Sequence, residues 1–160
     1  MDVNHVGITV SDIDAAVAFY TSVFDFEVLV PPRTGNLGSP RSEIRRDVFG
    51  PKWEEVKGAH LATPRGVGLE IFQFVTPTTV KPGDNFEYWK VGISHFALTV
   101  DDLEGTIARL VAAGGRRRSG VHTLSPGTQI CYCEDPFGVV IELASSSYHT
   151  IAGVRQASDK

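Results

Sequence analysis

Apolar and polar residues alternate in several short segments of the chain, which predicts strands that bury one face. In the segment 3–12, Val6, Ile8 and Val10 are apolar and are separated by polar or small residues. A period of two residues is typical of a strand that packs one face on a core. Residues 13–23 then carry apolar side chains three and four positions apart, which predicts an amphipathic helix. The chain is therefore expected to begin with a strand followed by a helix.

The same pattern recurs 90 residues later in the chain. The segment 93–102 repeats the alternation, and His95 corresponds to His5. In both copies a helix pattern follows the strand. Ser11 and Asp101 are each followed three residues later by an acidic residue, as in a capping box, so we expect them to begin the two helices. The repeat indicates two copies of one structural unit.

Further strand patterns follow each helix, separated by turn residues such as those at 64–66 and 135–138. The sequence therefore predicts an α+β fold with one domain over 1–150, built from two βαβββ modules. We place the modules at about 1–75 and 91–148, with a linker at 76–90 and a C-terminal tail at 149–160. The stretch 31–57 has low periodicity and is predicted to be a long loop.

Four polar residues at equivalent places in the two modules are candidate metal ligands. His5 and His95 begin equivalent strands, while Glu70 and Glu142 lie 72 residues apart within apolar final strands. Two carboxylates about 4 Å apart repel by roughly 4 kcal/mol at an effective dielectric near 20, so a proton or a cation must lie between them. Two imidazoles and two carboxylates suit one divalent ion such as Zn, Ni, Co, Mn or Fe(II). The alternative is hydrogen-bonded structural histidines and solvated glutamates.

Composition narrows the possible function. The 160 residues are 42% hydrophobic and 21% charged, which is typical of a globular chain. Fifteen basic against nineteen acidic residues give a formal net charge of −4, which argues against a nucleic-acid partner. We find neither a signal-peptide pattern nor an apolar run of the ~18 residues that a membrane span needs, so we expect a cytoplasmic protein without a membrane partner.

Cys131 and Cys133 are expected to be reduced thiols.

The repeat resembles the vicinal oxygen chelate superfamily, which includes glyoxalase I, methylmalonyl-CoA epimerase, extradiol dioxygenases and drug-resistance proteins. The resemblance covers nearly the whole chain and rests mainly on the segments 5–12, 95–102 and 134–143. It implies that the paired modules form a curved, partly open mixed-sheet barrel around a metal cleft. It also implies a homodimer, and it leaves open whether the metal ligands come from one chain or from two. The ligands that it implies are His5, Glu70, His95 and Glu142.

The ligand set is closest to that of glyoxalase I, which uses two histidines and two glutamates, whereas the epimerase carries glutamine where Glu70 stands. The resemblance implies a divalent-metal-dependent lyase or isomerase that acts on a small-molecule substrate. Proton abstraction next to a carbonyl would give an enediolate, with Glu142 as the preferred general base and Glu70 as the second catalytic carboxylate. The alternatives are a drug-binding resistance protein without catalysis and an Fe(II) ring-cleaving dioxygenase.

Four further residues are candidate substrate contacts. Phe72 and Phe74 share the strand parity of Glu70, so they are predicted to line the cleft and to favour a partly apolar substrate. The alternative is that they are ordinary core aromatics. Arg45 and Arg46, in the expected loop, are candidates to bind a carboxylate or phosphate of the substrate. The alternative is a solvated loop whose arginines form ion pairs.

Two other groups of residues receive no functional assignment. The three arginines at 116–118 follow a predicted helix end and are expected to be solvated. His60, His122 and His149 show no partner in the repeat, and we assign them no role. The identity of the substrate, the metal and any thiol cofactor stays open.

Overall fold

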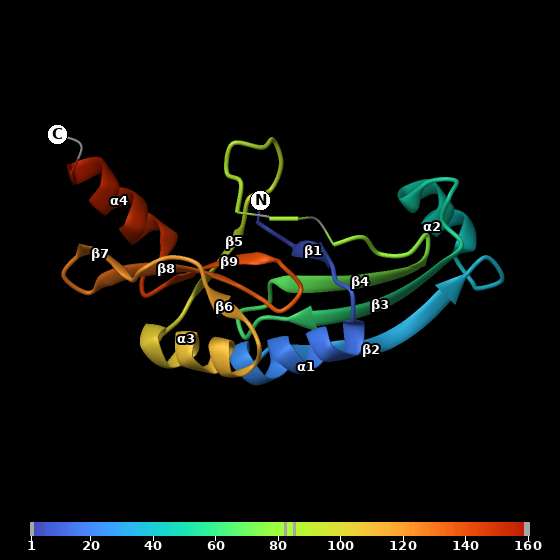
Figure 1. Ribbon diagram of the computed structural model, residues 1–160, viewed down its shortest axis with the longest axis horizontal. Coiled ribbons are helices and arrows are strands. Elements are labelled where there is room, and N and C mark those ends of the chain that lie inside the picture. The colour runs from blue at the N-terminus through green and yellow to red at the C-terminus, as the bar shows by residue number, and fades with distance from the viewer. Residues whose placement is uncertain (1, 82, 85, 159–160) are drawn as a thin grey trace. The chain divides into compact units, whose positions relative to one another are not determined.

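The computed structural model describes residues 2–81, 83–84 and 86–158, with side chains up to residue 153 (Figure 1). The chain divides into two compact units, Met1–Lys81 and Pro82–Lys160. Each unit holds one mixed β-sheet together with two helices, so the predicted α+β class is confirmed. No helix in the described ranges has both the length and the apolar character needed to cross a membrane.

The first unit forms a four-stranded sheet in the order β1-β4-β3-β2. The first and last strands of the unit, β1 and β4, pair in parallel, and the other pairs are antiparallel. The last strand therefore lies beside the first, although two helices and two strands separate them in the sequence. The elements are β1 (His5–Thr9), α1 (Ile13–Phe24), β2 (Glu27–Asn36), α2 (Ser42–Phe49), β3 (Glu55–Ala62) and β4 (Gly68–Thr76).

The second unit repeats this arrangement with an additional strand. Its path is β5-β9-β8-β6, with β7 also paired to β8. The first and last strands, β5 and β9, are again parallel. The elements are β5 (Phe96–Thr99), α3 (Leu103–Ala112), β6 (Arg116–Arg117), β7 (His122–Ser125), β8 (Thr128–Glu134), β9 (Val140–Ala144) and α4 (Tyr148–Ser158).

The stretch 31–57 is more regular than its sequence suggests. β2 continues to Asn36 because its backbone pairs with β3, and α2 occupies the middle of the stretch. The register shifts between Val30 and Arg33, where two consecutive prolines lack the N–H that a strand ladder needs. Pairing with a neighbouring strand thus supplies the order that side-chain periodicity does not indicate.

The C-terminal tail also contains a helix that the sequence pattern does not predict. Ile151 of α4 is buried and packs with Ile130 and Ala144 of the second sheet. The tail therefore covers part of its own unit, on the face of the sheet that carries Glu142.

Alternation along β3 and β4 separates a core face from a polar face. Leu69 and Ile71 are buried and stand opposite Leu61 and Ala59 of β3. Helix α1 contacts β2, β3 and β4 and lies along the sheet (Figure 1). Glu70 lies between the two buried residues and projects to the opposite face, as the period-two pattern predicts.

The two equivalent helices are capped by aspartates one residue later than expected. Asp12 Oδ1 accepts a hydrogen bond from the Ala15 N–H at 3.0 Å, and Asp102 Oδ1 accepts one from the Gly105 N–H at 2.9 Å. The expected caps, Ser11 and Asp101, are therefore wrong by one position. A serine or aspartate side chain can cap a helix from either of the two positions. The path of the backbone therefore decides which of the two neighbouring residues is the cap.

Replacing the cap of α3 should destabilise the protein. We expect Asp102→Ala to lower the free energy of unfolding by about 1 kcal/mol, because a first-turn N–H loses its acceptor. Urea denaturation followed by circular dichroism measures this. Asp101→Ala is the matched control, since Asp101 is exposed, and it should change the value by less than about 0.5 kcal/mol. A larger loss in the control would contradict the assignment of the cap.

The two cysteines are free thiols in the core of the second unit, as expected. Cys131 and Cys133 are fully buried, and their sulfur atoms lie 3.9 Å apart. Burial, followed by the neighbouring Cys131 thiol, raises the pKa of Cys133 to about 12. The reactive thiolate is therefore scarce near neutral pH.

The folded protein should resist thiol alkylation. At pH 8, a pKa of about 12 leaves only ~1 in 10,000 of the Cys133 thiols ionised, and burial excludes the reagent as well. Mass spectrometry after a short iodoacetamide treatment should find both cysteines unmodified. The same treatment in denaturant should modify both. Rapid modification of the native protein would contradict their placement in the core.

Candidate metal centre

In the first unit, parallel pairing of β1 with β4 brings a histidine and a glutamate together. His5 Nε2 lies 3.8 Å from Glu70 Oε2, and both side chains are partly exposed. Gly68 stands opposite His5 in the ladder, where an added Cβ would lie only 2.9 Å from His5 Cβ. A glycine at this position therefore lets the histidine approach the strand that carries Glu70.

In the second unit, the equivalent pair is closer and more buried. His95 Nε2 lies 3.0 Å from Glu142 Oε2, and the two side chains are 25% and 10% exposed. His95 directly precedes β5, and Glu142 stands opposite Ala97 in the parallel ladder with β9. Each unit thus brings together the histidine and the glutamate that the sequence repeat singles out.

The residue before each histidine holds the other nitrogen of its ring. His5 Nδ1 lies 2.7 Å from Asn4 Oδ1, and His95 Nδ1 lies 3.1 Å from Ser94 Oγ. An amide oxygen only accepts hydrogen bonds, so His5 Nδ1 donates, and in the neutral ring Nε2 carries the lone pair. Sequence reasoning missed these two residues, although they are 90 residues apart, as the histidines are.

A second pair of partners lies across the sheet from the glutamates. His60 Nδ1 is 3.6 Å from Glu70 Oε1, and Tyr132 Oη donates a hydrogen bond to Glu142 Oε2 at 3.0 Å. His60 stands opposite Glu70 in the β3–β4 ladder, as Tyr132 stands opposite Glu142 in the β8–β9 ladder. His60 therefore has a repeat equivalent, 72 residues later. The sequence comparison missed it because the two residues differ in type.

The donor atoms present fit a divalent metal ion. Two ligand atoms about 2.1 Å from one ion lie about 3.0–3.4 Å apart, and the His95–Glu142 separation of 3.0 Å is at the lower end of that range. In the first unit, the lone pair of neutral His5 faces a carboxylate, which is unfavourable unless a proton or a cation lies between them. Among the described residues, no three His, Cys, Asp or Glu side chains form an ion-binding group. Each unit thus supplies a pair of donors.

Aromatic rings surround the pair in the second unit. The centroids of Tyr88 and Tyr132 lie 5.7 Å and 5.3 Å from that of His95, and Tyr132 meets His95 edge to face. Phe86 packs on both tyrosines. Burial, followed by the charge of Glu142, raises the pKa of Tyr88. These rings limit the access of water to the pair.

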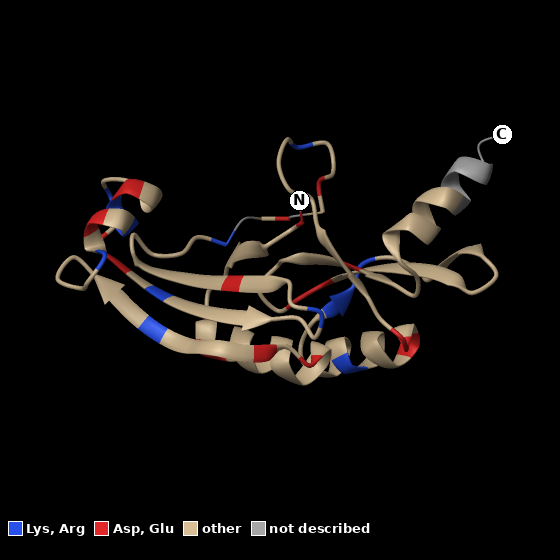
Figure 2. Cartoon of the chain, turned by 180° about the vertical axis from the view of Figure 1, so that it is seen from behind, with Lys and Arg blue, Asp and Glu red and all other residues tan. Residues whose placement is uncertain are grey.

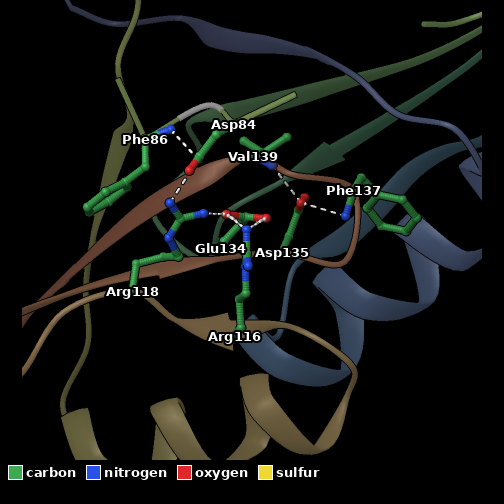
Figure 3. A network of polar contacts seen from close by, with 8 residues as sticks. All are labelled: Asp84, Phe86, Arg116, Arg118, Glu134, Asp135, Phe137 and Val139. Atoms are coloured by element: carbon green, nitrogen blue, oxygen red, sulfur yellow. Dashed lines mark hydrogen bonds and ion pairs between the residues drawn. The ribbon is translucent and has the colours of Figure 1, made fainter. Parts of the chain in front are cut away.

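An ion network anchors the segment that carries two of these rings (Figure 3). Arg118 donates to Glu134 and to Asp84, and its guanidinium lies 4.4 Å from the centre of the Phe86 ring. The hydrogen bond from Arg118 lowers the pKa of Asp84. Arg116 also pairs with Glu134, at 3.0 Å. The prediction that the whole run 116–118 is solvated is therefore wrong for Arg118, whose side chain is only 12% exposed.

The predicted substrate contacts of the first unit lie on two elements. Phe72 and Phe74 are half-buried on the polar face of β4, and Phe49 of α2 packs edge to face on both, at 5.4 Å and 5.1 Å. Arg45 Nη1 donates to the Pro40 carbonyl, so it braces the loop before α2. Arg46 is exposed on α2, where acidic and basic residues are mixed (Figure 2). Contact of these residues with a substrate stays a prediction.

Comparison with known proteins decides the family. The model of the "Glyoxalase/Bleomycin resistance protein/Dioxygenase superfamily" matches residues 2–143. The chain belongs to this superfamily. The predicted resemblance is thereby confirmed, and the duplicated histidine and glutamate lie within the matched range.

Similar proteins within the superfamily include a lactoylglutathione lyase from Arabidopsis thaliana, which is 29% identical over 87% of this chain. The chain spans only 42% of that relative's length. A glyoxalase family protein from Bacillus cereus has a similar fold, with a TM-score of 0.75, 22% identity, and coverage of 90% of this chain and 93% of the other. A glyoxalase I variant from Zea mays has a TM-score of 0.61 and 21% identity, with coverage of 91% and 45%.

Removing the Arg118 guanidinium should destabilise the second unit. We expect Arg118→Met to lower the free energy of unfolding by about 2 kcal/mol. This is less than the roughly 3–5 kcal/mol lost on breaking a fully buried ion pair, because Arg116 still pairs with Glu134. Urea denaturation measures the change. Arg117→Met, at the exposed neighbouring residue that ends β6, should change stability little. Equal losses in both variants would contradict the role of the network.

Proposed function

We propose that the protein is a divalent-metal-dependent lyase or isomerase that transfers a proton at a carbon next to a carbonyl group. The main support is the duplicated pair in which an imidazole Nε2 faces a glutamate oxygen, at 3.8 Å in the first unit and 3.0 Å in the second. Membership of the glyoxalase superfamily and the similarity to a lactoylglutathione lyase agree with this activity.

In this proposal, one divalent ion is held by His5, Glu70, His95 and Glu142 together. When bound, it would act as a Lewis acid on the carbonyl oxygen of the substrate and stabilise the negative charge that develops there. Asn4 and Ser94 keep the Nδ1 atoms of the two histidines engaged, which favours presentation of Nε2 to the ion. The histidine–glutamate pairs of both units would supply ligands to this ion. The two pairs would come either from one chain or from the two chains of a homodimer.

Glu142 is the preferred base that removes the proton and, once protonated, would return it at the neighbouring atom. Glu70 is the second catalytic carboxylate in this proposal. The side chain of Glu142 is 10% exposed, which protects it from bulk water. Phe72 and Phe74 would pack on an apolar part of the substrate, and Arg45 and Arg46 would bind an anionic group.

Metal binding is the first test. Protein stripped of metal and titrated with Co²⁺ should bind one ion per chain, and Glu142→Ala should weaken binding by more than the roughly 10–100-fold that loss of an outer partner costs. Isothermal titration calorimetry gives both values. Glu27→Ala, at an exposed glutamate of β2, should bind like the wild type. Failure of the unaltered protein to bind metal, together with unchanged stability of Glu142→Ala, would rule out the proposal.

Proton transfer is the second part of this test. The metal-loaded protein in D₂O should convert the hemithioacetal of methylglyoxal and a thiol, or a related α-hydroxy carbonyl compound, with deuterium appearing at the reacting carbon. Proton NMR follows the exchange, and metal-stripped protein is the control. Oxygen uptake with a catechol in the presence of ferrous iron would instead favour a dioxygenase.

A binding protein without catalysis is the second candidate. The aromatic cluster of Phe49, Phe72 and Phe74 favours it, because three rings on the polar face of the first sheet suit an aromatic ligand. Tight binding of an aromatic drug to the metal-free protein, without proton exchange in any substrate, would support this candidate over an enzyme.

Mixing two inactive variants shows how many chains supply the ligands. Glu70→Ala and Glu142→Ala chains, refolded together, would regain activity only if a site combines units from two chains. If each site uses one chain, every site in the mixture lacks a ligand. Recovery of activity therefore identifies a shared site in a homodimer.

A further inference from the structure

The residue opposite each glutamate differs between the two units. Tyr132 donates a hydrogen bond of 3.0 Å to Glu142, whereas His60 comes no closer than 3.6 Å to Glu70 in the corresponding pair. Both residues lie on the polar face of their sheet, directly across the ladder from the glutamate. The cross-strand partner is thus a hydrogen-bond donor to the carboxylate in the second unit and a more distant imidazole in the first.

Two contacts meet at a single oxygen in the second unit. Tyr132 Oη and His95 Nε2 each lie 3.0 Å from Glu142 Oε2. A carboxylate oxygen has two lone-pair directions, so Glu142 Oε2 can accept the tyrosine hydrogen bond and still contact a second group. The hydroxyl thus helps to hold this oxygen 3.0 Å from His95 Nε2.

The Tyr132 ring is itself held in position. It packs edge to face against His95, Phe86 and Tyr88, with centroid separations of 5.3, 6.4 and 5.9 Å. Phe86 is anchored beneath Arg118. The hydroxyl therefore has little freedom, and the carboxylate that it contacts is only 10% exposed. In the first unit, by contrast, Glu70 is 28% exposed.

From this geometry we propose that Tyr132 is a positioning residue that orients Glu142 for metal binding, making the second unit the pre-organised half of the metal centre. This inference rests on the proposed function. A glutamate held in one rotamer loses less conformational freedom when it binds an ion, and partners of this kind commonly contribute 10–100-fold to metal affinity, by order of magnitude. The contacts of Glu70 are longer, so its cross-strand partner should contribute less to metal affinity.

The test compares hydroxyl removal at Tyr132 with the equivalent change in the first unit. Tyr132→Phe keeps the ring and its aromatic contacts and should weaken Co²⁺ binding about tenfold or more. His60→Phe should weaken it by a smaller factor, because no hydrogen bond is lost. Tyr148→Phe removes a hydroxyl from a side chain that is 76% exposed and should bind like the wild type. Competition with a chromophoric chelator measures each dissociation constant.

Two further readouts separate positioning from a general effect on folding. The visible absorption of bound Co²⁺ should change in Tyr132→Phe, since the orientation of a ligand carboxylate alters, and should stay unchanged in Tyr148→Phe. Thermal melting of the metal-free proteins identifies a temperature at which all variants are folded, and binding is compared there. A lower melting temperature with wild-type affinity and spectrum would overturn the inference.

The outcomes also distinguish the two proposals. If the wild-type protein binds no Co²⁺, the proposed function fails. If it binds Co²⁺ and Tyr132→Phe binds equally well with the same spectrum, the proposed function stands and the positioning role is overturned. An equal loss in His60→Phe and Tyr132→Phe would also overturn the inference, because the proposed difference between the units would be absent.

Discussion

Parallel pairing of the first and last strands of each unit is the constraint on which the candidate site depends. In the first unit it sets β1 beside β4, and in the second it sets β5 beside β9. The backbone ladder determines which side chains are neighbours, because a shift of one residue would turn the glutamate into the core. The His–Glu pairs are therefore a consequence of strand register, and the helices and strands between the paired strands supply the long connection that parallel pairing requires.

The buried faces of the two sheets maintain this register. Ile71 and Leu69 in the first unit, and Ile141 and Leu143 in the second, are nearly inaccessible to solvent. A slip of one residue would move these side chains to the face that carries the glutamate, and burying a large aliphatic side chain contributes about 1.5–3 kcal/mol. Hydrophobic burial on one face therefore stabilises the placement of polar groups on the other.

The duplication is regular in geometry but not in chemistry. Both histidines have a polar residue before them, and both glutamates have a partner across the sheet, yet that partner is His60 in one unit and Tyr132 in the other. The two units thus hold similar donor pairs that differ in burial and in cross-strand contacts. Such a difference would suit the unequal roles that we propose for the two carboxylates.

The sequence by itself determined the duplicated α+β plan and the four candidate ligands, because period-two burial and a fixed residue offset are local properties of the chain. It did not indicate α4, the continuation of β2, or the capping role of Asp102, since each depends on which segment a backbone or side chain meets. The partner role of His60 and the burial of Arg118 were likewise decided by tertiary structure. Cross-strand neighbours and ion pairs join residues that are distant in the chain, and their spacing follows no local period.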